Sequence, residues 1–127
     1  HSHEGLDEIS IAGSTHVCEL RNGNLTSYSL SPEDVGLKLQ SLEGLEVSSA
    51  AESAGLIRGA LGGDKDERAQ KAAAMLTLNA GATLYVAGVA ATIADGVAMA
   101  EDVVATGQAG EKLKAFVDFT QLMRQEG

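Results

Sequence analysis

Residues 15–30 read Thr-His-Val-Cys-Glu-Leu-Arg-Asn-Gly-Asn-Leu-Thr-Ser-Tyr-Ser-Leu, and the organisation of the chain follows from this stretch. Two runs that favour β-structure, residues 15–20 and 25–30, flank residues 21–24. The Asn-Gly pair between such runs is a strong short-range signal for a β-hairpin. A further short strand is expected at residues 9–12. The sequence therefore predicts that the first third of the chain is rich in strands.

The pattern becomes helical after the hairpin. Ser31-Pro32, followed by two acids, is typical of a helix start, and Gly36 is expected to end that turn. Residues 38–47 are polar and have no clear period, which indicates a connecting loop. A helix is expected over residues 50–61, with Ser48 or Ser49 as its cap and Gly62-Gly63 as its end, and a buried helix over 67–86, ended by Gly88. A third is expected over about 92–106, where Thr92 and Asp95 form a capping box and Gly107 is the end. The last is expected over 108–124, and one broad face of it carries Leu113, Phe116, Val117 and Leu122.

Composition limits the class of protein. With 127 residues the chain is long enough for a single domain, but only 3% of its residues are aromatic, so the core must use Leu, Ile, Val and closely packed alanine helices. The net charge of −9 argues against a nucleic-acid or anionic-membrane partner. The single cysteine, Cys18, is expected to be a small buried hydrophobe and fits a reducing cytoplasm. No apolar run approaches the length of a membrane span.

Adjacent carboxylates at Asp7 and Glu8, two residues after Gly5, are the best clue to chemistry. Neighbouring residues on a regular strand point to opposite faces, so the two acids converge on one cation only if the backbone bends, which Gly5 permits. Mg²⁺ suits such a pair because it is commonly held by one or two carboxylates together with substrate phosphates. The alternative is that both acids are simply solvated in a loop.

A family resemblance begins at these acids and continues along most of the chain. It is carried by His1-Ser2, Gly5-Leu6-Asp7-Glu8-Ile9-Ser10, Thr15-His16-Val17, Glu19-Leu20, Asn22-Gly23, Ser31-Pro32-Glu33-Asp34, Gly36-Leu37, Asn79-Ala80-Gly81, Leu84-Tyr85, Gly96-Val97 and Gly107. In this order the residues resemble the carboxy-terminal part of anthranilate phosphoribosyltransferase. The resemblance implies an α/β fold, namely the last portion of the phosphoribosyltransferase α/β domain, with a few strands including a hairpin and then several helices.

The resemblance also implies an activity and a set of partners. The family transfers the phosphoribosyl group of phosphoribosyl pyrophosphate to anthranilate in tryptophan biosynthesis, and it uses Mg²⁺, which Asp7 and Glu8 would hold. His1 would lie near the ribose phosphate. The family's amino-terminal helical domain, through which it dimerises, and its Gly-Thr-Gly-Gly-Asp and Lys-His-Gly-Asn-Arg motifs have no counterpart here. Residues 1–127 are therefore expected to be a single-domain, inactive fragment of a cytoplasmic homodimeric enzyme.

Other functional interpretations are less favoured. Gly62-Gly63-Asp64 mimics the end of a phosphate loop, but a helix end is the expected role. Asn79 is expected to satisfy a neighbouring backbone group, and the pair His16 and Cys18 lacks the further ligands of a soft metal site. Two other functions stay open: a same-fold pyrimidine nucleoside phosphorylase or inactive relative, and a non-catalytic binding domain.

Overall fold

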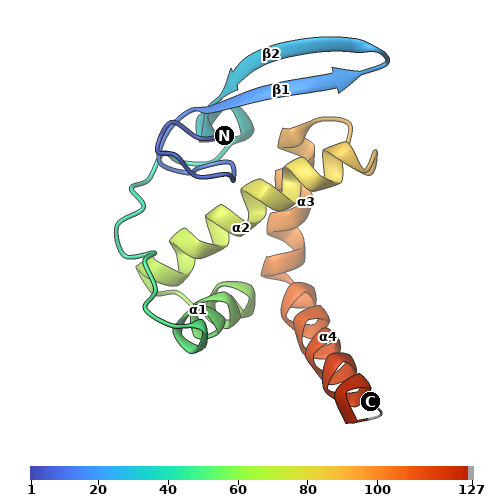
Figure 1. Cartoon of the computed structure of the whole chain (residues 1–127). Coiled ribbons are helices and arrows are strands. Elements are labelled where there is room, and N and C mark those ends of the chain that lie inside the picture. The colour runs from blue at the N-terminus through green and yellow to red at the C-terminus, as the bar shows by residue number, and fades with distance from the viewer. Residues whose placement is uncertain (126–127) are drawn as a thin grey trace.

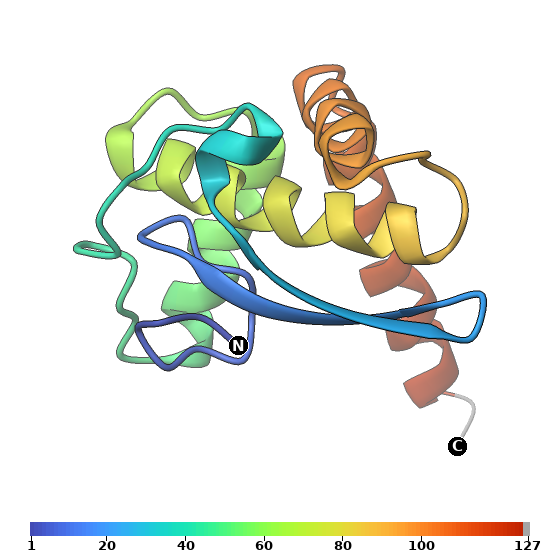
Figure 2. The same cartoon turned by 90° about the horizontal axis from the view of Figure 1, so that it is seen from above.

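A β-hairpin lies over a group of four helices in the computed structural model, which describes residues 1–125 (Figure 1). The elements are, in chain order, β1 (Thr15–Arg21), β2 (Asn24–Leu30), a short 3-10 helix η1 (Pro32–Val35), α1 (Ala50–Gly62), α2 (Glu67–Val86), α3 (Ile93–Ala105) and α4 (Gln108–Gln125). The hairpin lies on one side of α2 and α1 on the other. Seen from above, the hairpin runs along α2 (Figure 2). The hairpin and the expected helices are thus confirmed.

The hairpin has the register that its turn requires. The strands are antiparallel, with Thr15 opposite Leu30 and Arg21 opposite Asn24. Asn22 and Gly23 form the two-residue connection, and both have positive φ, 51° and 79°. Turns of this kind match the right-handed twist of paired strands and favour Asn-Gly, which explains why the sequence located the hairpin so well.

Side-chain caps begin the three internal helices. The hydroxyl of Ser49 accepts from the Glu52 N–H at 3.1 Å, and the hydroxyl of Thr92 accepts from the Asp95 N–H at 3.0 Å. Both caps confirm the sequence prediction. The cap of α2 is Asp66, whose carboxylate accepts from the Ala69 N–H at 3.0 Å. Each bond satisfies a backbone donor that has no partner within its helix.

The strand expected at residues 9–12 is wrong, because this segment is an irregular bend. Its backbone groups find partners other than a neighbouring strand. The Ser10 N–H donates to the hydroxyl of Thr15 at 3.2 Å, and the Ala12 N–H donates to the hydroxyl of Ser10 at 3.0 Å. The carbonyl of Ile11 accepts from the Gln40 N–H at 2.9 Å, so the loop after η1 is tied to this segment as well.

The core joins the hairpin to α2 and α3. Its buried members are Ile11, Leu30, Val35, Leu78 and Val97, with buried alanines on the helices around them. The aliphatic and alanine-rich core that composition predicts is therefore confirmed. Helices α2 and α3 approach closely at Gly81 and Gly96, where a Cβ added to Gly96 would lie 2.3 Å from the carbonyl oxygen of Gly81.

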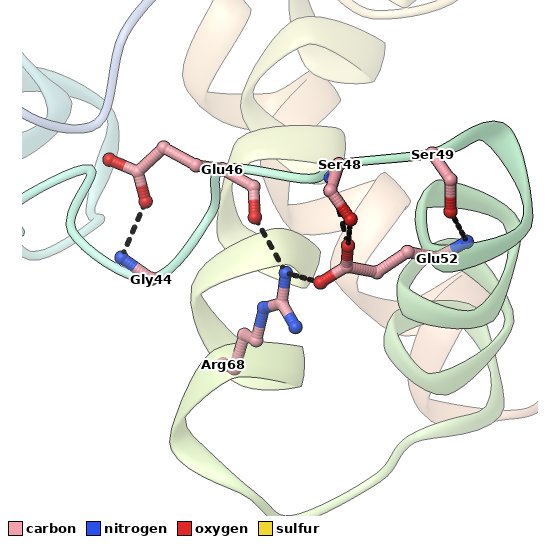
Figure 3. Close-up of polar contacts among 6 residues, drawn as sticks. All are labelled: Gly44, Glu46, Ser48, Ser49, Glu52 and Arg68. Atoms are coloured by element: carbon pink, nitrogen blue, oxygen red, sulfur yellow. Dashed lines mark hydrogen bonds and ion pairs between the residues drawn. The ribbon is translucent and has the colours of Figure 1, made fainter.

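A polar cluster fixes the loop between η1 and α1 against α2 (Figure 3). Arg68, on α2, donates from one nitrogen to the carbonyl of Glu46 at 2.8 Å and to the carboxylate of Glu52 at 2.9 Å. The same carboxylate accepts from the N–H and the hydroxyl of Ser48, both at 2.8 Å. These bonds lower the pKa of Glu52 to about 2, with the Ser48 backbone donor as the largest cause.

The broad face expected on α4 is only partly covered. Leu113 and Val117 are half-buried, whereas Phe116 and Leu122 are 63% and 57% exposed. Beyond its first turns α4 extends away from the other helices. Within residues 1–125, every helix is too short or too polar to cross a membrane.

Candidate functional site

Asp7 and Glu8 lie in an irregular loop before β1, and both side chains are exposed. Among residues 1–125, neither carboxylate makes a hydrogen bond or an ion pair. Gly5 has φ +88°, so the backbone turns two residues before Asp7. Within residues 1–125 the carboxylates of Asp7 and Glu8 therefore have no polar partner, and a cation site at this pair stays a prediction.

The loop is anchored on its amino-terminal side by Ser2, which is only 1% exposed. The N–H of Ser2 donates to the carbonyl of Leu6, and the hydroxyl of Ser2 accepts from the N–H of Leu6, both at 3.0 Å. A β-bridge pairs Ser2 with Thr15 at the start of β1. The residue before Asp7 is thus fixed relative to the hairpin.

Asn79 anchors the other side of the loop. Its amide oxygen accepts from the Ile9 N–H at 3.0 Å, and its amide nitrogen donates to the Ile9 carbonyl at 2.9 Å and to the Met75 carbonyl at 3.0 Å. The prediction that Asn79 satisfies backbone groups is confirmed. The sequence did not indicate that the partner would be the residue directly after Glu8, 70 positions away.

Whether Asp7 and Glu8 hold Mg²⁺ stays a prediction. Within the described residues no group of three or more His, Cys, Asp or Glu side chains could hold a metal ion. Asp7 and Glu8 provide two hard oxygen ligands without competing partners. Mg²⁺ retains waters and takes its remaining ligands from phosphates, so a pair of carboxylates is enough protein for such a site.

His1 lies beside β1. Its backbone nitrogen donates to the His16 carbonyl at 3.0 Å, its carbonyl accepts from the His16 N–H at 2.8 Å, and the two rings are 5.9 Å apart. Within residues 1–125 it makes no hydrogen bond to Asp7 or Glu8. Its expected role at the substrate stays a prediction.

Two other sequence expectations have clear outcomes. Cys18 is exposed, so the expected burial is wrong. Its neighbours in β1, Val17 and Glu19, turn toward the helices, so Cys18 lies on the outer face, where its sulfur is 3.0 Å from the Ser27 hydroxyl. Gly63 ends α1 with φ +78°, which confirms a helix end rather than a phosphate loop.

A polar cluster that the sequence did not reveal lies in a cleft of about 640 Å³ between the hairpin and α2. Glu19 accepts from the phenols of Tyr28 and Tyr85, and Arg21 donates to the Tyr85 oxygen at 3.1 Å. Burial and Glu19 raise the pKa of Tyr28, and the hydrogen bond to Glu19 is the largest cause of the raised pKa of Tyr85. These groups satisfy one another, so the cluster joins β1 to α2.

Known proteins similar to this chain agree on one family. A family model described as "Glycosyl transferase family, a/b domain" matches residues 1–110. Anthranilate phosphoribosyltransferase of Saccharophagus degradans is 58% identical over 122 residues, which cover 96% of this chain and 36% of that protein. The protein of the same name from Teredinibacter turnerae is 54% identical, with coverage of 95% and 36%. The chain thus spans about a third of the length of these relatives.

Solved structures of similar proteins share the fold. The crystal structure of anthranilate phosphoribosyltransferase from Thermus thermophilus superimposes with a TM-score of 0.78 at 37% identity, over 93% of this chain and 34% of that one. Anthranilate phosphoribosyltransferase from Saccharomyces cerevisiae, in complex with 4-fluoroanthranilate, gives a TM-score of 0.74 at 24% identity, over 91% and 33%. The hairpin and helices described above are therefore part of an α/β glycosyltransferase fold.

Proposed function

The chain belongs to the glycosyl transferase family whose α/β domain it matches over residues 1–110, and from this membership we propose that it works in phosphoribosyl transfer to anthranilate. The chain would act within a protein of the relatives' length that contains these 127 residues, hereafter the full-length protein. The observation that carries the proposal is identity above 50% along nearly the whole chain to proteins named for this reaction.

The reaction makes specific demands on the protein. The bond from ribose C1 to the pyrophosphate oxygen breaks, a bond from C1 to the anthranilate nitrogen forms, and the amine releases a proton. Such a transfer depends mainly on holding the reactants in place and on stabilising the charge of the leaving group. Mg²⁺ would supply that stabilisation by neutralising pyrophosphate. Asp7 and Glu8, exposed and unpaired within residues 1–125, are the residues that we assign to hold it.

The proposal also covers where the protein works, how it assembles and which residue lies near the substrate. We assign His1 to the substrate phosphate region, because the resemblance places it there. We expect the full-length protein to be a homodimer that assembles through a helical domain outside these residues. The single cysteine supports a cytoplasmic location.

The decisive experiment assays the full-length protein with anthranilate, phosphoribosyl pyrophosphate and Mg²⁺. Chromatography with mass detection should show phosphoribosyl anthranilate and pyrophosphate in equal amounts. In parallel, the protein is given uridine and inorganic phosphate. Release of uracil together with no transfer to anthranilate would overturn the proposal and favour a pyrimidine nucleoside phosphorylase. No turnover in either assay by folded protein would favour a non-catalytic relative.

A further inference from the structure

The acidic pair is bracketed by two residues whose backbone groups are both held by other parts of the fold. On one side, the N–H and the carbonyl of Leu6 are bonded to Ser2, both at 3.0 Å. On the other, the N–H and the carbonyl of Ile9 are bonded to the amide of Asn79, at 3.0 and 2.9 Å. Between these anchors, Asp7 and Glu8 make no hydrogen bond of their own to the described residues.

Both anchoring residues, Ser2 and Asn79, are themselves held in place by the fold. Ser2 is 1% exposed and is bridged to Thr15 at the start of β1. Asn79 follows Leu78, which is fully buried in the core, and its amide nitrogen is also held by the Met75 carbonyl one turn earlier at 3.0 Å. The loop is thus tied at one end to the hairpin and at the other to α2, which the core joins together.

Consecutive side chains diverge on a regular extended backbone, so two adjacent carboxylates reach one ion only from a defined bent conformation. Among the described residues, no hydrogen bond or ion pair orients the side chains of Asp7 and Glu8, so the backbone on either side sets their direction. We propose that Ser2 and Asn79 are positioning residues, which set the loop so that both carboxylates face the same Mg²⁺. This inference rests on the proposed function, because it takes the metal assignment of Asp7 and Glu8 as its premise.

The same contacts would exist if Asn79 only stabilised the fold, and the two roles differ in what they change. A purely structural role lowers the stability of the protein and leaves the metal affinity of the folded molecules unchanged. A positioning role lowers metal affinity in molecules that are still folded. Groups that orient metal ligands typically change affinity by about tenfold or more when removed.

The test measures Mn²⁺ binding, with Mn²⁺ as a paramagnetic probe for the Mg²⁺ site, by electron paramagnetic resonance of the full-length protein. Asn79→Ala removes both bonds to Ile9, and Ser2→Ala removes the acceptor for Leu6 while leaving α2 intact. Each should weaken Mn²⁺ binding by about tenfold. Should Asn79→Ala not fold, the Ser2→Ala result decides alone, and unchanged binding in that variant overturns the proposal.

The matched control is Thr77→Ala. Thr77 lies on the same helix, is 3% exposed, and lines the cavity toward α1 and α3 instead of the acidic loop. The Thr77→Ala variant should lower the melting temperature of the full-length protein and leave its Mn²⁺ affinity unchanged. If it weakens binding as much as Asn79→Ala, the loss follows general destabilisation, and the positioning role is wrong.

Two further variants separate this inference from its premise. Asp7→Asn and Glu8→Gln should each weaken Mn²⁺ binding. When Asn79→Ala is added to a variant that carries both of these substitutions, Mn²⁺ affinity should fall no further. If the acid variants weaken binding and the two anchor variants do not, the metal assignment stands and the positioning proposal falls. If the acid variants leave binding unchanged, the metal assignment fails, and the positioning proposal falls with it.

Discussion

Asp7 and Glu8 are the residues on which the proposed chemistry depends most directly. Both are exposed and have no polar partner among the described residues, so their replacement should disturb the fold little. In the full-length protein, Asp7→Asn and Glu8→Gln should lower the rate of transfer and raise the Mg²⁺ concentration needed for half-maximal rate. A lost charged ligand should weaken the site by roughly 1–3 kcal/mol, because waters and substrate oxygens remain as ligands.

Magnesium titrations of the two single variants and the double variant provide the check. The double variant should require more Mg²⁺ than either single one. The resemblance selects these two acids from the sequence, because their offset from the later motifs is specific, and their metal-binding role stays a prediction. If both single-variant titration curves coincide with the wild-type curve, Mg²⁺ does not bind at these carboxylates.

Glu52 shows how local hydrogen bonds make stability depend on pH. Its folded pKa is about 2, below the ordinary value of 4.5, so the folded state favours the ionised carboxylate. The stabilisation is therefore complete above about pH 4.5 and is lost as the pH falls toward 2. The difference in melting temperature between wild type and Glu52→Gln should be largest near neutral pH and shrink over that window.

Ser48→Ala gives a graded control for this prediction. It removes the hydroxyl donor to Glu52 and leaves the backbone donor, so it should show a smaller part of the same pH dependence. The experiment is a series of thermal unfolding curves between neutral pH and about pH 3 on all three proteins. A Glu52→Gln effect that is constant across this range would show that the folded state does not favour the ionised carboxylate.

At the scale of the elements, the sequence predicted well wherever the signal is local. The Asn22-Gly23 turn and the Thr92 cap each depend on residues within a few positions, and both were confirmed. The expectation for residues 9–12 failed because their backbone groups bond to side chains, those of the nearby Ser10 and Thr15 and of the distant Asn79, instead of to a neighbouring strand. Cys18 was misjudged because the half-buried polar Glu19 on the inner face of β1 obscures the alternation of the strand.

The crossing of α2 and α3 depends on two glycines. A Cβ added to Gly96 would lie 2.3 Å from the carbonyl oxygen of Gly81, and one added to Gly81 would lie 2.6 Å from the backbone nitrogen of Val97. Backbone atoms cannot yield as flexible side chains do, so Gly96→Ala must separate the helices. The cost should be about 1–3 kcal/mol, despite the better helix propensity of alanine.

Gly55→Ala is the matched control, because Gly55 lies inside α1 and an added Cβ would have no atom within 4 Å. That variant should be as stable as wild type or more stable by about 0.5–1 kcal/mol. The melting temperature of the full-length protein should fall for Gly96→Ala and hold or rise for Gly55→Ala. Equal melting temperatures for the two variants would mean that the helix crossing is not as close as described.

At the scale of the whole molecule, the described residues leave much of α4 uncovered. Phe116 and Phe119 on this helix are 63% and 59% exposed. The sequence indicated an apolar face on α4 without indicating how little of it the other helices would cover. Helical periodicity shows which residues share a face, and burial depends on what else packs there.

The last prediction is that the 127-residue chain by itself does not form phosphoribosyl anthranilate. The chain contains the acids assigned to Mg²⁺, but its sequence has neither the Gly-Thr-Gly-Gly-Asp nor the Lys-His-Gly-Asn-Arg motif, to which the resemblance assigns most phosphate and anthranilate contacts. A metal-bound pyrophosphate group without a positioned nucleophile lacks the main source of rate enhancement in such a transfer. The experiment assays the chain beside the full-length protein, with circular dichroism to establish that the chain is folded. Turnover by the chain of about 1 per second, typical of an ordinary enzyme, would show that these residues hold a complete site.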